Sequence, residues 1–511
     1  MTKTKPTQSP PEPAETDLPE GWATIALGEV VSSAKGKKPP DLLPERHAAS
    51  VPYIDIRAFE TGQYREFTAT ESAKLASEGS LLIVWDGARS GLVGRMPCDG
   101  AVGSTLAVLH PRLIDTDYLQ YFLQANFDFI NSNTRGTGIP HVDPGTLWNV
   151  EFPVAPLAEQ ERIVAKVEEL LARVNAARAR LDKLPAILKR FRQSVLAAAC
   201  SGQLTADWRD QQLAEPADVA LARSAKMVDT KSIRHLVRRG TEGLPTADIP
   251  EIPSTWASRS VRQLVEAGAI VDFQDGNHGS LYPRSTDFGD SGVKFLTAAQ
   301  VFDNRVLLDE APLLKREKAK VLRIGFAQPM DVLLTHNATV GRVAILPKYE
   351  GKVILGTSVT YYRANADVLL PEYLCFAMQG QVWQDQLRSV MEQTTRNQVS
   401  VTKQVEFLLL IPPIEEQREI VRRVEALFAL ADKIDARIQA ASARVEKTTQ
   451  AILAKAFRGE LVPTEAELAR RDGRPYESAA DLLGRIHGAS AAGQHKGGPV
   501  RALRARKAER V

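Results

Sequence analysis

A long internal repeat constrains the architecture of this 511-residue chain more than any other feature of its sequence. Residues 156–204, which begin PLAEQERIV, align without a gap to residues 413–461, which begin PIEEQREIV, and 18 of the 49 paired positions are identical. The offset of 257 residues far exceeds the period of a solenoid, whose units repeat every 20–50 residues or so. We therefore expect a duplicated two-part unit.

The stretch that precedes each repeated segment is of a different kind. Both stretches begin with a proline followed three residues later by a tryptophan, Pro19 with Trp22 and Pro253 with Trp256. Beyond this start they share only fragments of pattern and otherwise diverge. Similar helical segments joined to dissimilar globular stretches indicate one scaffold that presents two different specificities.

The repeated segments carry the heptad pattern of a coiled coil, with apolar residues at alternating steps of four and three. Prolines precede both segments and Gly202 and Gly459 follow them, as expected at helix ends. Pro185 predicts a break in the first copy only, because proline cannot donate to the carbonyl four residues earlier. The predicted seam comprises Ile163, Val167, Leu170, Val174, Ala177, Leu181, Leu184, Leu188, Phe191, Val195 and Ala198, and in the second copy Ile420, Val424, Leu427, Ala431, Ile434, Ile438, Ala441, Val445 and Ile452.

The two helical segments are expected to pack on each other within one chain. The alternative is a coiled coil that only joins two chains. Covalent duplication favours the intramolecular pairing, since the second copy is always present at high effective concentration.

Composition excludes several classes of protein. Hydrophobic residues make up 44% and charged residues 25%, as in globular proteins, and no apolar run of about 18 residues could span a bilayer. The polar, proline-rich start lacks the apolar stretch of a secretory signal, so we expect a cytoplasmic protein. Three distant cysteines support neither disulfides nor a zinc cluster. A net charge of +3 is too small to indicate a nucleic-acid partner by itself.

The globular stretches mix short apolar runs with glycines and turns, which indicates α+β domains. The runs Leu81–Trp85, Val332–Leu334 and Val353–Leu355 read as strands. In each stretch an apolar run enters a polar, glycine-containing loop, at 86–91 and at 335–342. A second polar cluster follows, at residues 133–138 and 394–398. A solvated turn explains any one of these loops equally well, but their matching positions favour a binding function.

The segments PLAEQERIVAKVEEL and RQSVLAAACSGQL, with their second copies PIEEQREIV and AFRGEL, resemble the conserved regions of type I restriction-modification specificity subunits. The resemblance implies two α+β target-recognition domains separated by two long helices that pack as an antiparallel intramolecular coiled coil with pseudo-two-fold duplication. The predicted parts are a disordered N-terminus (1–17), recognition domain 1 (18–155), helical spacer 1 (156–204), a linker (205–250), recognition domain 2 (251–412), helical spacer 2 (413–462) and a C-terminal tail (463–511).

The resemblance also implies a function and partners. Each recognition domain would read one half of a bipartite, asymmetric site in double-stranded DNA, and the helices would set the gap between the halves. The helices would dock two modification subunits, which methylate adenine with S-adenosylmethionine. Two restriction subunits would add nuclease activity driven by ATP with Mg²⁺. The chain itself would hold no cofactor or metal and would contact no membrane.

Polar and charged side chains in loops of both domains are the candidates for DNA contacts. Lysine and arginine suit phosphates, while arginine, asparagine and glutamine suit the edges of guanine and adenine. The candidates in domain 1 are Lys35, Lys37, Lys38, Arg89, Ser90, Arg135, Thr137 and His141, and those in domain 2 are Asn277, His278, His336, Asn337, Arg342, Arg396 and Asn397.

No catalytic motif accompanies these loops. The sequence contains neither the N-P-P-Y/F motif of adenine methyltransferases nor a G-x-x-x-x-G-K-S/T phosphate loop, so we expect a non-catalytic subunit. Two alternatives remain: a single-chain restriction-modification enzyme that has lost its catalytic part, and a coiled-coil adaptor that binds only protein. Retention of duplex DNA by the purified chain separates the adaptor from a DNA-reading subunit.

Overall fold

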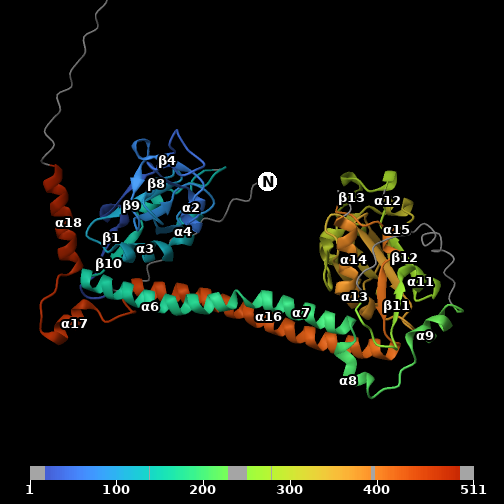
Figure 1. Cartoon of the computed structure of the whole chain (residues 1–511). Coiled ribbons are helices and arrows are strands. Elements are labelled where there is room, and N and C mark those ends of the chain that lie inside the picture. Colours follow the sequence, from blue (N-terminus) through green and yellow to red (C-terminus); the bar gives the residue numbers. More distant parts are fainter. Residues whose placement is uncertain (1–17, 137, 228–249, 278, 393–396, 495–511) are drawn as a thin grey trace, which may run out of the picture. The chain divides into compact units, whose positions relative to one another are not determined.

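The computed structural model describes residues 18–136, 138–227, 250–277, 279–392 and 397–494 (Figure 1). The chain divides into two structural units. Unit 1 consists of Met1–Asp182 with Ala440–Val511, and unit 2 consists of Lys183–Gln439. Each unit contains one globular domain, called domain 1 (18–155) and domain 2 (251–412) below. In the described residues, no helix combines the length and apolar character needed to cross a membrane.

Domain 1 contains two four-stranded sheets and a two-stranded ribbon. In the ribbon, β1 (Ala23–Ala26) pairs antiparallel with β10 (Glu151–Val154), so the first and last strands of the domain lie side by side. One sheet has the order β2-β9-β6-β7 and the other the order β4-β3-β8-β5. Their bounds are β2 Val31–Lys35, β9 Leu106–Pro111, β6 Leu81–Val84, β7 Val93–Arg95, β4 Phe67–Ala69, β3 Ser50–Ile54, β8 Gly100–Val102 and β5 Leu75–Ala76.

Domain 2 follows the same plan with additions. Its ribbon pairs β11 (Ala257–Ser260) with β23 (Leu408–Ile411), and its sheets have the orders β12-β22-β19-β20 and β13-β17-β14-β21-β18, with a separate β15-β16 hairpin. The remaining bounds are β12 Ile270–Asp275, β22 Val359–Ala364, β19 Val332–Thr335, β20 Val343–Ile345, β13 Phe288–Gly289, β17 Leu313–Leu314, β14 Val293–Leu296, β21 Val353–Leu355, β18 Phe326–Ala327, β15 Val301–Phe302 and β16 Arg305–Val306.

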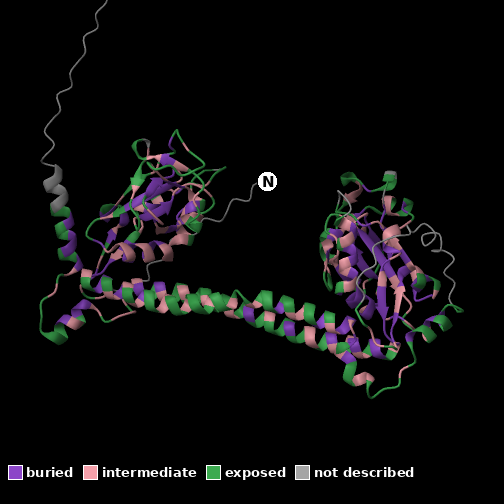
Figure 2. Cartoon of the chain, in the orientation of Figure 1, coloured by how far each residue is buried: buried purple, intermediate pink, exposed green. Residues whose placement is uncertain are grey.

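The three predicted apolar runs form strands β6, β19 and β21, which confirms that part of the prediction. All residues of these strands are buried, including Thr335 at the end of β19. Figure 2 shows that buried residues fill much of the sheets in both domains. Helices cover the sheets: α1 Leu27–Val30, α2 Ile56–Thr61, α3 Thr116–Ala125, α4 Phe127–Ser132 and α5 Pro144–Trp148 in domain 1, and α11 Val261–Glu266, α12 Arg316–Val321, α13 Pro371–Gln379, α14 Gln381–Glu392 and α15 Val401–Gln404 in domain 2.

The helical spacers form as predicted, including the break in the first copy. That copy consists of α6 (Leu157–Leu181) and α7 (Leu184–Cys200), with Pro185 in the first turn of α7, whereas α16 (Ile414–Phe457) is unbroken. The pairing is antiparallel in both units: the Arg178–Glu446 ion pair joins α6 to α16 in unit 1, and Arg192–Asp432 joins α7 to α16 in unit 2. Seam residues that are buried are Ile163, Val167, Leu188, Val195, Ile420, Val424, Ala431 and Ile438.

The repeated Glu-Gln pair at the start of each spacer ties the helix to its domain. The side chains of Glu159 and Glu416 are fully buried, and each accepts a hydrogen bond of 2.9 Å from the indole N–H of the domain's first tryptophan, Trp22 or Trp256. Burial raises the pKa of Glu159, because hydrogen bonds only partly replace its hydration. This repeated contact gives a physical reason for the similarity of the two spacers.

The duplication extends further than the sequence alignment. In unit 2, α8 (Ala206–Arg209) and α9 (Ala217–Ser224) follow the first spacer, and the amide of Ala217 donates to the carbonyl of Thr255 at 3.0 Å. In unit 1, α17 (Glu465–Asp472) and α18 (Ala479–Gln494) follow the second spacer, and the amide of Ala479 donates to the carbonyl of Gly21 at 2.8 Å. Both acceptors directly precede the domain's tryptophan. Parts of the predicted linker and tail are therefore equivalent helices that dock on the two domains.

Candidate DNA-recognition surfaces

The predicted polar loop at 86–91 meets a second segment in domain 1, which begins at the last residue of the predicted polar cluster at 133–138. We call residues 85–92, between β6 and β7, the hairpin loop, and residues 138–142 the partner segment. The amide of Val142 donates to the carbonyl of Trp85 at 2.8 Å, and the amide of Gly87 donates to the carbonyl of Pro140 at 2.8 Å. These bonds fix two segments that are about 50 residues apart in sequence against each other.

Domain 2 builds the same pair of segments with other residues. Here the hairpin loop is residues 336–342, between β19 and β20, and the partner segment is residues 397–399. The amide of Val399 donates to the carbonyl of His336 at 2.9 Å, and the amide of Ala338 donates to the carbonyl of Asn397 at 3.0 Å. Isolated β-bridges join Asn337 to Gln398 here and Asp86 to His141 in domain 1. One backbone arrangement thus carries Asp and His in one domain and Asn and Gln in the other.

A third segment begins at the end of β2 in domain 1 and at the end of β12 in domain 2, which are edge strands of the β2-β9-β6-β7 and β12-β22-β19-β20 sheets. Gly36 follows β2 and Gly276 follows β12, and a Cβ at these positions would lie 2.2 Å from the carbonyl oxygen of Gly103 and 2.0 Å from that of Gly356. Only glycine allows such a close approach of two backbone segments. The predicted residues Lys37, Lys38 and Asn277, together with Lys35 at the end of β2, therefore occupy equivalent strand ends.

In domain 1 an acidic side chain joins all three segments. The carboxylate of Asp86 lies 2.8 Å from the Lys35 ammonium and 2.7 Å from Nδ1 of His141. Burial acts to raise the pKa of Asp86, but the hydrogen bonds from Lys35 and His141 outweigh it, so the pKa is lowered and the carboxylate is ionised. Asp86 lies in the loop that sequence reasoning selected, yet it is absent from the predicted contacts because only its three-dimensional partners reveal its position.

Three of the predicted contact residues have buried side chains. Ser90 is fully buried and donates to the carbonyl of Gly87 at 2.7 Å. Asn277 donates to the carbonyl of Ile324 at 2.7 Å. Nδ1 of His336 lies 3.1 Å from the carbonyl of Val399, and burial lowers the pKa of this histidine to about 4. In this conformation these side chains support the loops from inside and leave their outer faces to other residues.

The remaining predicted residues lie at or near the surface, and several have charged partners. Arg89 pairs with Glu60 at 2.6 Å, and Arg135 pairs with Asp143. Exposed or half-exposed residues of the set are Lys35, Lys37, Lys38, Arg89, Arg135, His141, Asn337, Arg342 and Asn397. Thr137, His278 and Arg396 lie outside the described residues.

In the ranges that the structure describes, no group of three or more histidine, cysteine, aspartate or glutamate side chains is arranged to hold a metal ion. The surfaces instead offer hydrogen-bond donors, acceptors and positive charge on loops that the sheets hold in place. That set of groups suits noncovalent recognition of a polyanion that presents a sequence of hydrogen-bond donors and acceptors.

Comparisons with known proteins agree with this geometry. The family model for the type I restriction modification DNA specificity domain matches residues 19–186 and 323–441, more than half of the chain. The EcoDI specificity subunit of Escherichia coli is 28% identical over 456 residues, which cover 87% of this chain and 89% of that protein. The EcoKI specificity subunit of Escherichia coli strain K12 is 29% identical over 464 residues, with coverages of 87% and 90%.

A solved structure concerned with complex assembly and conformational transition of the type I R-M system contains a chain of similar fold. The TM-score is 0.61 at 21% identity, and the match covers 87% of this chain and all of that chain. This similarity confirms the predicted fold. The match to the family model, together with the specificity-subunit relatives, confirms the predicted non-catalytic, sequence-reading role. The chain belongs to the family of type I restriction-modification specificity subunits.

Proposed function

We propose that this chain reads a bipartite, asymmetric sequence in double-stranded DNA, one half with each domain. The observation that carries the proposal is the hairpin loop with its partner segment, which both domains build with the same backbone bonds but with different side chains. Two domains that recognise different half-sites need the same backbone arrangement but different side chains on it.

The side chains at the equivalent bridges differ in what they can recognise. An ionised carboxylate such as Asp86 accepts hydrogen bonds and suits the amino group of cytosine. Amides such as Asn337 and Gln398 both donate and accept, and they suit the edge of adenine. Exposed lysines at the end of β2 add sequence-independent contacts to phosphates, which position the domain on the duplex. The two half-sites should therefore differ in sequence.

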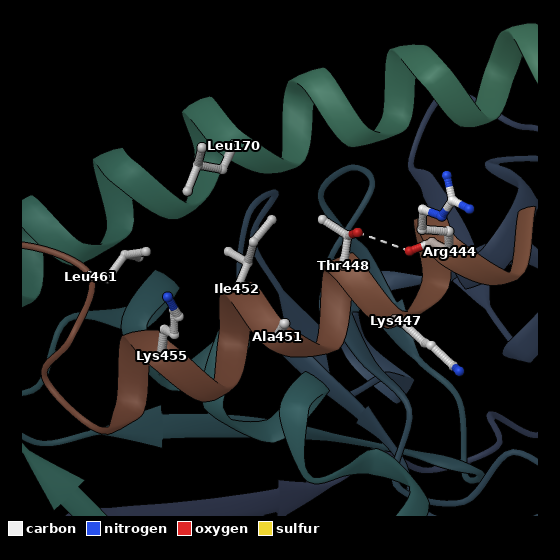
Figure 3. Close-up of a pocket in the computed structure, with 8 residues that line it drawn as sticks. All are labelled: Leu170, Arg444, Lys447, Thr448, Ala451, Ile452, Lys455 and Leu461. Carbon is white, nitrogen blue, oxygen red and sulfur yellow. Dashed lines mark hydrogen bonds between the residues drawn. The ribbon is translucent and has the colours of Figure 1, made fainter. Parts of the chain in front are cut away.

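The helical spacers would dock the two modification subunits, which bring S-adenosylmethionine and adenine methylation. In unit 1 a groove of about 530 Å³ lies along α6 and α16, with an apolar floor that includes Leu170 and Ile452. Figure 3 shows these two side chains facing each other, with Arg444 and Lys455 toward opposite ends of the groove. An apolar floor with basic ends suits an acidic, amphipathic segment of a modification subunit.

Two restriction subunits, with ATP and Mg²⁺, would complete the nuclease. The helical spacers would then set the number of unspecified base pairs between the half-sites. Both points rest on membership of the family and on the absence of catalytic motifs from this sequence.

Mapping of methylated adenines in a host genome tests the proposal. The chain is co-expressed with its modification subunit, and cells with the modification subunit alone serve as the control. A gapped motif that appears only with this chain is the expected result. A continuous motif would contradict the two-domain reading, and no new methylation from a soluble complex would favour the protein-only adaptor.

Docking is tested separately by a pull-down experiment, in which variants of this chain with a reversed charge retain or lose the modification subunit. Lys455→Glu should weaken retention, whereas Lys189→Glu on α7 adds the same charge change outside the groove. Equal retention by the two variants would remove the groove from the proposed interface.

A further inference from the structure

Resting on the proposed DNA-reading function, we propose that Arg305, Phe302 and Arg342 of domain 2 form a clamp for a DNA phosphate. We call these three residues the arginine clamp. Arg342 lies in the hairpin loop and was predicted from the sequence as a DNA contact, whereas Arg305 and Phe302 lie on the β15-β16 hairpin and were not.

The clamp is built around one aromatic ring. The guanidinium carbon of Arg342 lies 4.6 Å from the centre of the Phe302 ring, and that of Arg305 lies 5.7 Å from it. Both distances fall within the range of favourable cation–π contact. Arg342 also donates from Nη1 to the carbonyl of Val301 at 3.3 Å. The ring therefore holds two guanidinium groups in defined positions beside the hairpin loop.

Backbone contacts fix the β15-β16 hairpin to the end of the hairpin loop. The amide of Asn304 donates to the carbonyl of Val343 at 3.0 Å, and the amide of Val343 donates to the carboxylate of Asp303 at 3.2 Å. The side-chain amide of Gln379 donates to Oδ1 of Asn304 at 2.7 Å. Arg305 thus moves with the recognition surface.

The clamp keeps its positive charge. Neither guanidinium pairs with any carboxylate of the described residues, whereas Arg89 and Arg135 of domain 1 are neutralised by Glu60 and Asp143. Arg305 is exposed and Arg342 is half-buried. Two ordered cations without an acidic partner attract an anion, and the planar fork of a guanidinium matches the geometry of a phosphate group. Because the ring already restricts the side chains, less conformational entropy is lost on binding.

The test measures the affinity of the complex with the modification subunit for a duplex that carries its methylation motif, as a function of salt. A plot of log K against log salt has a negative slope, and Arg305→Ala should make that slope less negative by about 0.9. This change corresponds to about an eightfold loss of affinity at 0.1 M salt. Phe302→Leu keeps both charges, so the slope should stay the same while the affinity falls about two- to fivefold. The methylated motif should stay the same in both variants, because a phosphate contact carries no sequence information.

Arg223→Ala on α9 is the control, since it removes the same charge from an exposed ion pair with Glu215. An unchanged slope with Arg305→Ala would overturn the clamp. A change in the methylated sequence of the half-site that domain 2 reads would overturn it too, because Arg305 would then contact a base. A wild-type complex without a gapped motif would instead reject the proposed function itself. The two failures are therefore distinguishable.

Discussion

Replacement of Glu416 by glutamine should destabilise unit 2 strongly. Glu416 is fully buried and accepts hydrogen bonds from the Trp256 indole at 2.9 Å and the Thr205 hydroxyl at 2.7 Å, and it pairs with Arg209. A glutamine has one acceptor oxygen in place of two, so at least one donor loses its partner and the Arg209 charge loses its counterion.

The expected cost follows from these contacts. A hydrogen bond to a charged group contributes about 1.5–3 kcal/mol, and removal of one partner of a buried ion pair costs about 3–5 kcal/mol. The side chain of Arg209 is 19% exposed and recovers some hydration, so we expect a loss of about 3 kcal/mol. For a unit of this size that loss lowers the melting temperature by about 6–12 °C.

Scanning calorimetry of the full chain measures the effect, and the neighbouring residue supplies a matched control. Glu415 is exposed and pairs with Arg418, so Glu415→Gln makes the same chemical change one position earlier and should cost under about 0.5 kcal/mol. If the Glu416→Gln and Glu415→Gln variants have the same melting temperature, the buried glutamate does not hold the helix on its domain.

Three further predictions concern other parts of the chain. Since burial raises the pKa of Glu159 above 4.5, its contribution to unit 1 stability should fall as pH rises from about 4.5 through its folded pKa, and Glu159→Gln should remove this decline in thermal melts. Gly276→Ala should cost more than about 2 kcal/mol in urea unfolding, because its Cβ would meet the Gly356 carbonyl, while Gly484→Ala on α18 has free space and should stabilise by about 0.5–1 kcal/mol. Asp86→Asn should alter only one half of the methylated motif in genome sequencing, and a change in both halves would refute independent reading by the two domains.

The sequence predicts local features of this protein well. The heptad seam and the effect of Pro185 depend on residues close together in the chain, and the structure confirms the break and much of the seam. The predicted seam is incomplete in both spacers, because Ala177 is exposed and Ile434 is 37% exposed. The matching positions of the polar loops in the two domains indicated a binding function, but their sequence did not predict which segments meet in space.

Features that depend on distant residues could not be predicted. The burial of Ser90 and His336 results from segments about 50 to 60 residues away that close over them. The arginine clamp requires a ring from the β15-β16 hairpin, which domain 1 replaces with a helix. Helices α9 and α18 are equivalent because each donates a backbone hydrogen bond to the residue before its domain's first tryptophan, and their side chains do not indicate this contact.

The ribbons β1-β10 and β11-β23 have a consequence for how such proteins evolve. Each ribbon places the entry of a domain beside its exit, as the pairing of Ala23 with Val154 shows. An insert whose two ends are neighbours can be exchanged as a cassette by recombination at those ends, without disturbance of the structure that receives it. If each domain reads one half-site, as proposed, one such exchange would replace half of the recognised sequence and leave the helical spacers unchanged.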